Sequence, residues 1–122
     1  MIHNKLGPRK EKAAMHDMTW SASEKKAAKA LFDTALQREL QAYLQEFKRS
    51  AASIDTPDAL WPLIDQAVKR EREIARTYDY RYSQLILVFA GLLRRGIIQE
   101  VEVGALGDEK ARHIIALARL KV

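Results

Sequence analysis

The chain has 122 residues, 48% hydrophobic and 30% charged, which predicts one folded domain rather than a disordered chain. It contains no cysteine, which excludes disulfides and thiolate chemistry and fits a reducing cytoplasm, where we expect the protein to reside. The formal net charge of +5 favours anionic partners without singling out nucleic acid.

The first 18 residues carry a cluster of basic side chains but no periodic apolar pattern. We expect residues 1–18 to be a mobile basic tail, with Met15 and Met18 as alternative starts of the protein. A solvated arm and a basic arm that binds a partner are the two interpretations of this segment. Because no apolar segment follows the basic residues, we expect no secretory signal. Residues 19–122 are expected to form a single all-helical domain.

A capping box predicts the start of a long helix, because Ser21 is followed three residues later by Glu24. No helix-breaking residue occurs from there to residue 51, so the helix is expected over 22–51. At 1.5 Å per residue it would be about 45 Å long. One small core does not require that length, so part of the helix is expected to pack on a second copy. Four large apolar residues at helical spacing form the seam for this packing: Leu36, Leu40, Tyr43 and Phe47.

A break at Ser53–Pro57 separates this helix from a second one that runs to about Tyr78. The position of a proline inside this segment leaves two interpretations. If the helix starts at Thr56, Pro62 removes a backbone hydrogen bond and kinks the helix. If Asp58 is the cap, Pro62 falls in the first turn and costs little.

The second helix has one apolar face and a neighbouring face that carries Trp61 with Asp65 one turn later. The pair is either part of the core with an incidental acid or a contact patch for a partner, since tryptophan is enriched among residues that dominate interfaces. Arg70 and Arg72, about two turns on, would complete a charged rim.

The stretch from Leu85 to Leu93 is apolar throughout and predicts a helix buried on all sides at the centre of the core. It is far shorter than the roughly 20 residues that a membrane span needs, so no membrane insertion is expected. Arg94, Arg95 and Gly96 predict its end, because cations in the last turn followed by glycine are typical of a helix C-terminus.

Residues 101–103 alternate like a strand, but a lone strand has no pairing partner, so a short helix is expected there. Gly107 is expected to end it and Asp108 to cap a last helix from Glu109 to about Leu120. Helices with short links make this an all-α protein. The last helix is expected to bury four residues: Ile114, Ile115, Leu117 and Leu120.

The chain shows no motif for catalysis or for binding a cofactor. Its histidines, His3, His16 and His113, are scattered, and His113 is expected to be an exposed helical residue. No glycine-rich phosphate loop and no nucleophile in a catalytic context is present in the sequence. We therefore expect no enzyme activity, no cofactor and no metal.

Several segments, in order and over about a hundred residues, together resemble the fluorescence recovery protein family. None of them is specific by itself, but the set is. The segments are ALFDTALQREL at 30–40, DALW at 58–61, YDYR at 78–81, VFAGLL at 88–93 and ALARL at 116–120.

The resemblance implies a cofactor-free, all-helical homodimer with a long helical stem and a small C-terminal helical head. It further implies binding of the photoactivated orange carotenoid protein at its C-terminal domain. The expected effect is a faster return of that protein to its inactive orange form and its release from the phycobilisome, which ends quenching. No substrate is turned over in such a role.

The family's stem patch has a tryptophan, a histidine, an aspartate and an arginine. Trp61 and Asp65 match it, whereas Ile64 stands at the histidine position and Glu71 at the arginine position. In the head, Leu87 stands where the family can have an aromatic residue. The expected partner-binding residues are Trp61, Ile64, Asp65, Arg70, Glu71, Arg72, Leu87 and His113, and the expected dimer contacts are Leu36, Leu40, Tyr43, Phe47 and Leu60.

These departures leave two further interpretations open. The chain is a dimeric interaction module for a different partner, or for a divergent carotenoid protein, in a host that lacks phycobilisomes. Alternatively it is a small basic protein that binds nucleic acid, although no recognition-helix pattern supports this. The resemblance predicts the fold more firmly than it predicts the partner.

Overall fold

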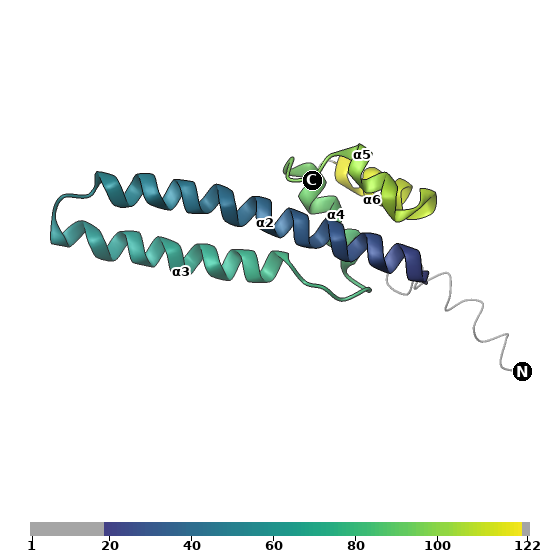
Figure 1. The fold of residues 1–122 in the computed structure, drawn as a ribbon, viewed down its shortest axis with the longest axis horizontal. Helices are drawn as coiled ribbons and strands as arrows, with labels where there is room; N and C mark the ends of the chain where they lie inside the picture. The colour runs from purple at the N-terminus through teal and green to yellow at the C-terminus, as the bar shows by residue number, and fades with distance from the viewer. Residues whose placement is uncertain (1–18, 121–122) are drawn as a thin grey trace, which may run out of the picture.

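The computed structural model describes residues 19–120. Two long helices lie side by side as a stem, and short helices form a head over one end of it (Figure 1). The predicted all-helical stem and head are confirmed within the described range, and the predicted tail at 1–18 lies outside it. The elements are α2 (Ala22–Ser53), η1 (Pro57–Ala59), α3 (Leu60–Thr77), α4 (Leu85–Arg94), α5 (Glu100–Val103), η2 (Gly104–Leu106) and α6 (Asp108–Arg119).

The start of α2 confirms the predicted capping box. The Ser21 N–H donates to Glu24 Oε1 at 2.9 Å, and the Glu24 N–H donates to Ser21 Oγ at 3.1 Å. Two backbone donors at the helix start are thereby satisfied reciprocally. The helix then continues for 32 residues and ends where Ile54 turns extended, two residues beyond the predicted end.

Of the two interpretations of Pro62, the structure supports the one that places it in the first turn. Pro57 opens a short 3-10 turn, and α3 itself begins at Leu60. The first four N–H groups of a helix have no intrahelical partner, so Pro62 removes no hydrogen bond. Asp58 itself does not cap α3, because Ala59 occupies the capping position and no side chain caps the helix.

The core lies where the head covers the first half of α2. The 3.6-residue periodicity of α2 turns one face toward the head, and α4, η2 and α6 supply the opposing side chains. The fully or almost fully buried residues are Trp20, Ala28, Leu31, Phe32, Ala35, Leu85, Ile86, Phe89, Ala90, Leu92, Ile98, Val103, Leu106, Ala111 and Ile114.

Helix α4 packs against α6 and is confirmed as the central helix of this core. The prediction that it is buried on all sides is wrong at Leu87, which is 47% exposed. The helix has neighbours on only some of its sides, and Leu87 lies on the outer side. Apolar content predicts that a helix is buried but does not show which side has no neighbour.

The end of α4 follows the prediction. Gly96 adopts a left-handed φ of 78°. The Ile97 N–H donates to the Leu92 carbonyl at 2.9 Å and the Gly96 N–H donates to the Leu93 carbonyl at 3.0 Å. This pair of bonds is the Schellman ending, which needs glycine at the left-handed position.

The short helix predicted after α4 is confirmed as α5 followed by η2. The predicted cap of α6 is wrong, because Asp108 is already helical and Gly107, with φ 99°, precedes it. Ile114 is buried as predicted, but Leu120 is 60% exposed, because α6 ends at Arg119 and Leu120 is extended. The other two predicted core residues, Ile115 and Leu117, are half-buried.

The link between α3 and α4 carries three tyrosines at alternate positions, and their rings line up along α2. Phe32 of α2 lies 5.4 Å from the Tyr78 ring and 4.8 Å from the Tyr80 ring, centroid to centroid. Tyr82 lies 5.6 Å from Tyr80 and 5.7 Å from Trp20. Alternate residues of an extended segment point the same way, which explains the spacing.

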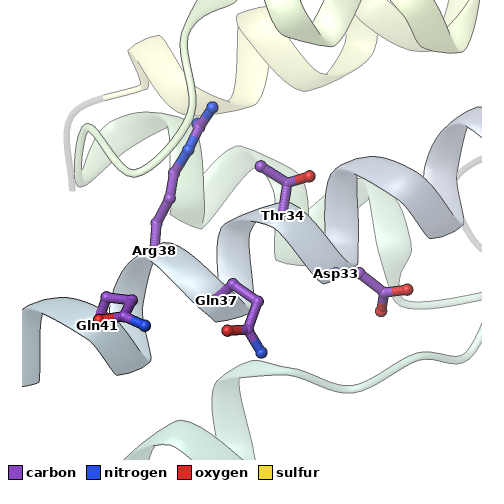
Figure 2. Close-up of a pocket in the computed structure, with 5 residues that line it drawn as sticks. All are labelled: Asp33, Thr34, Gln37, Arg38 and Gln41. Atoms are coloured by element: carbon purple, nitrogen blue, oxygen red, sulfur yellow. The ribbon is translucent and has the colours of Figure 1, made fainter. Parts of the chain in front are cut away.

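A bidentate ion pair ties α2 to the head. Arg38 donates to both carboxylate oxygens of Glu102, at 2.9 and 2.6 Å, and to the Ile97 carbonyl at 3.0 Å. The bonds from Arg38 and from the Gln99 N–H lower the pKa of Glu102 to about 2. Figure 2 shows Arg38 reaching from α2 toward the head.

The Glu102 carboxylate therefore predicts acid-sensitive stability. Its pKa is lower in the folded chain, at about 2, than the ordinary value of 4.5, so its contribution is complete above pH 4.5 and is lost as the pH falls toward 2. Glu102→Gln should therefore lower the urea midpoint at pH 7, and the difference from the unmodified protein should shrink at pH 3. The exposed Asp58→Asn is the control. A difference that stays constant with pH would contradict the assignment.

None of the helices between residues 19 and 120 combines the length and the apolar content that a membrane span requires.

Candidate protein-binding surface

The stem hairpin of α2 and α3 has two unlike sides. Polar and charged side chains from both helices line a hollow of about 280 Å³ on one side. At its centre the Arg70 guanidinium lies 4.5 Å from the Tyr43 ring centroid and 3.6 Å from carboxylate oxygens of Glu46 and Glu73. Arg70 thus holds α3 against α2 within one chain. The residues lining the hollow are Tyr43, Glu46, Gln66, Lys69, Arg70 and Glu73.

The other side of the hairpin is apolar and uncovered. Five large aliphatic side chains there are each 38 to 43% exposed, and Leu63 is the one residue of α3 that is buried. A contiguous exposed apolar surface of this kind is typical of a protein-binding site. We call this set the stem stripe: Leu40, Leu44, Leu60, Ile64 and Val68.

The two halves of the stem stripe lie on the same side of the hairpin. Leu40 of α2 and Glu71 of α3 line one narrow hollow of about 150 Å³ at the seam between the helices. Glu71 follows Ile64 by seven residues, and residues seven apart share a helix face. The spacing of four from Leu40 to Leu44 keeps that side continuous along α2. Glu71 therefore brings a negative charge to the side of the hairpin that carries the stem stripe, and Arg70 lines the same hollow from the seam.

Trp61 lies at the edge of the stem stripe, in the first turn of α3, and is 64% exposed. Ile64 and Asp65 follow it at three and four residues, so helical spacing brings the three together. Asp65 and Arg72 are both exposed and lie seven residues apart along the same edge. The structure thus assembles most of the predicted stem patch but places Arg70 against α2, away from Trp61.

The two predicted head residues lie far from this patch within one chain. Leu87 is exposed on α4, and His113 is half-buried on α6, where an exposed position was expected. The first turn of α3, with Trp61, lies at the end of the stem opposite the head (Figure 1). The predicted partner-binding residues therefore form two separate surfaces on a single chain.

The predicted dimer contacts divide in the same way. Leu40 and Leu60 belong to the exposed stem stripe, whereas Tyr43 lies beneath Arg70 of its own chain. Leu36 and Phe47 are half-buried. Sequence reasoning missed Leu44 and Val68, although each continues a spacing of four residues from a predicted position.

A further hollow of about 600 Å³ lies along α2, where none of the sequence-predicted residues contributes (Figure 2). The five described residues that line it come from one helix and do not converge on a point. Between residues 19 and 120, no three histidine or acidic side chains gather where they would hold a metal ion. The residues lining the hollow are Asp33, Thr34, Gln37, Arg38 and Gln41.

Comparison with known proteins supports the resemblance. A family model described as photoprotection regulator fluorescence recovery protein matches residues 20–118. The fluorescence recovery protein of Synechocystis sp. (strain ATCC 27184 / PCC 6803 / Kazusa) is 43% identical over 101 residues, which cover 83% of this chain and 93% of that protein.

Two solved structures show the same fold. The fluorescence recovery protein of Fremyella diplosiphon superposes with a TM-score of 0.78 at 33% identity, and that of Synechocystis sp. PCC 6803 with a TM-score of 0.78 at 42% identity. Each comparison covers 84% of this chain and 100% of the other. The chain therefore belongs to the fluorescence recovery protein family of photoprotection regulators.

Proposed function

We propose that this chain acts as a homodimer that binds the photoactivated orange carotenoid protein through its C-terminal domain. Binding would speed the return of that protein to the inactive orange state and end quenching at the phycobilisome. The observation that carries the proposal is the exposed apolar side of the stem with Trp61 and Asp65 at its edge. Residues 19–122 would serve as one dimerisation and partner-binding domain, with 1–18 as a basic tail.

The second copy would cover the stem stripe. A single chain leaves five large aliphatic side chains of this stripe partly in water, which is unfavourable because apolar surface is stabilised by burial. A two-fold axis brings the same surface of both copies together, so a continuous apolar side can pair with itself. The dimer contacts would then centre on Leu40, Leu44, Leu60, Ile64 and Val68.

The proposed regulator makes and breaks no covalent bond. It shifts the conformation of its partner, which requires that it bind the states along the recovery path with different affinities. The edge beside the stem stripe, with Trp61, Asp65 and Arg72, and the head residues Leu87 and His113 would supply these contacts. An exposed tryptophan beside charged residues suits such a protein interface.

Dark recovery of the photoactivated carotenoid protein tests the proposal. After illumination, the decay of the red form is followed by absorbance with increasing amounts of this protein. We expect the decay rate to rise until one dimer is present per carotenoid protein and then to level off. A rate that does not change across stoichiometric additions would refute the activity for the tested partner.

Trp61→Ala and Asp65→Leu should each weaken the complex while the dimer stays intact. Truncating a central interface residue typically costs about 2 kcal/mol, which corresponds to about thirtyfold in the dissociation constant. Titration with the photoactivated partner measures the affinity, and sedimentation velocity measures the dimer. Gln66→Ala, on the polar side of the same helix, is the matched control. Unchanged complex formation in both variants would remove the patch assignment.

The residues Ile64 and Glu71 favour a second candidate, a dimeric module that acts on a different partner. Ile64 stands at the family's histidine position, and Glu71 places an acid where the family has arginine. The paired reversions Ile64→His and Glu71→Arg discriminate between the candidates. If only the doubly reverted protein accelerates recovery, the second candidate holds. If the unmodified chain is already active, the first holds.

A further inference from the structure

Lys110 is the one charged side chain that is buried among residues 19–120, with 2% of its surface exposed. It projects from the first turn of α6. Its ammonium group donates to the Thr19 carbonyl at 2.7 Å and to Glu24 Oε1 at 2.9 Å, and it lies 4.9 Å from the Trp20 ring centroid. A buried ammonium is costly unless partners replace its water, and here two acceptors and an aromatic face do so.

The carboxylate that pairs with Lys110 is also the one that caps α2. Glu24 Oε1 accepts from the Ser21 N–H at 2.9 Å while it accepts from Lys110. The bond from the Ser21 N–H has the largest effect, and together with the bond from Lys110 it holds the pKa of Glu24 below its ordinary value. The capping box of α2 and the neutralisation of Lys110 therefore depend on one group.

Gly107, directly before α6, lets this carboxylate approach the start of that helix. A Cβ atom at Gly107 would lie 2.9 Å from Glu24 Oε2, and the φ of 99° is one that residues with side chains rarely adopt. No side chain of its own caps α6. A carboxylate near a helix N-terminus is favourable. The starts of α2 and α6, remote in sequence, thus meet at Glu24.

Among the described hydrogen bonds, Lys110 alone joins α6 to the stem. The other ties from head to stem, Arg38 with Glu102 and Arg95 with Glu39, come from α5 and from the end of α4. His113 lies three residues after Lys110 on α6, and residues three apart are neighbours on a helix. A change in the orientation of α6 at Lys110 would therefore also move His113, which lies one helical turn away.

We propose that Lys110 and Glu24 form a latch that orients α6, and with it His113, relative to the stem, and that partner affinity depends on this orientation. The claim about partner affinity rests on the proposed function. Lys110 is buried and would touch no partner, so its role is that of a positioning residue. The latch would keep the stem edge and the head at a fixed distance from each other, which a partner that contacts both surfaces requires.

The orientation itself is measured by distances between spin labels. The chain contains no cysteine, so Ala52→Cys in α2 and Ala116→Cys in α6 give a clean pair of labels. Both sites are exposed, and excess unlabelled protein limits each proposed dimer to one labelled copy. We expect a single narrow distance distribution in the unmodified background. It should shift or broaden in each of three latch variants: Lys110→Met, Glu24→Gln and Gly107→Ala.

Gly104→Ala is the matched control, because a Cβ at Gly104 meets no atom within 4 Å and its φ is −56°. It should leave the distribution unchanged. Glu24→Gln can still accept from the Ser21 N–H, so it separates the ion pair from the helix cap. If Lys110→Met fails to fold, the other two variants still decide. A distribution that stays narrow and unshifted in all folded latch variants overturns the latch.

The effect of the latch on partner affinity is measured separately. Each latch variant should bind the photoactivated carotenoid protein about tenfold more weakly with an unchanged dimer, and His113→Ala should add little in a latch variant because both act through the same turn. Fully additive losses would overturn the positioning role. If the unmodified chain neither binds the carotenoid protein nor accelerates its recovery, the proposed function fails, and with it the proposed effect of the latch on partner affinity. The distances between the spin labels then decide by themselves whether the latch orients α6.

Discussion

Phe89→Ala is expected to lower the free energy of unfolding by about 3–5 kcal/mol, because it removes a fully buried ring and leaves a cavity. Phe89 has no exposed surface and lies in the middle of α4, the helix at the centre of the core. Single domains are stable by only about 5–15 kcal/mol, so this variant should be close to unfolding. Urea denaturation followed by circular dichroism, at several protein concentrations, measures the change.

Leu87→Ala is the control for this prediction, because Leu87 lies on the same helix two residues earlier and is 47% exposed. Substitutions at exposed sites usually change stability by about 0.5 kcal/mol or less. The contrast between the two variants tests the placement of α4 directly. Equal losses in both would mean that the outer side of α4 is covered in the folded protein.

The helix boundaries that the sequence predicts well are those determined by neighbouring residues. The capping box at Ser21 and the glycine ending at Gly96 each involve backbone groups within a few positions of each other. The caps of α3 and α6 are exceptions. Asp108 is already helical in α6, and at α3 Asp58 and Thr56 are good capping residues, but a 3-10 turn displaces the helix start to Leu60. Short turns of this kind depend on how the connection must close, which local pattern does not specify.

Burial was harder to predict from the sequence, because burial depends on where other helices lie. An apolar run such as Leu85–Leu93 indicates a buried helix but not its open side, so Leu87 was misplaced. Lys110 is the opposite case, because lysines usually lie at the surface and this one lies in the core. Its partners Thr19 and Glu24 are remote in sequence, and no local signal connects them to it.

The candidate site was partly predictable for the same reason. Helical spacing alone brings Trp61 and Asp65 together. Arg70 and Arg72 looked equivalent as a charged rim, yet two positions correspond to about 200° around a helix. The structure accordingly places Arg70 against Tyr43 of α2 and leaves Arg72 exposed on the edge. Helical spacing therefore puts the two arginines on opposite sides of α3, and the packing of α2 shows which of these sides is covered.

Val68→Glu should convert the proposed dimer to a monomer while the chain remains helical. Val68 is 41% exposed in the single chain, so a carboxylate there stays solvated when the chain is alone. In a two-fold dimer the substitution places two charges in an apolar interface that already includes Glu71, and burying unpaired charges is very unfavourable. We expect a loss of more than about a hundredfold in dimer affinity, measured by sedimentation velocity.

Gln66→Glu makes the same change of charge on the same helix but on the polar side of the hairpin, where Arg70 and Lys69 line the hollow beside it. It should leave the dimer intact. If Val68→Glu also sediments as a dimer, the copies meet elsewhere and the stem stripe has another partner. If the unmodified chain is monomeric at micromolar concentration, the stem stripe is open in solution, and the dimeric regulator does not exist in the proposed form. The two variants together show whether a loss of dimer comes from a charge on the side of the stem that pairs or from the added negative charge itself.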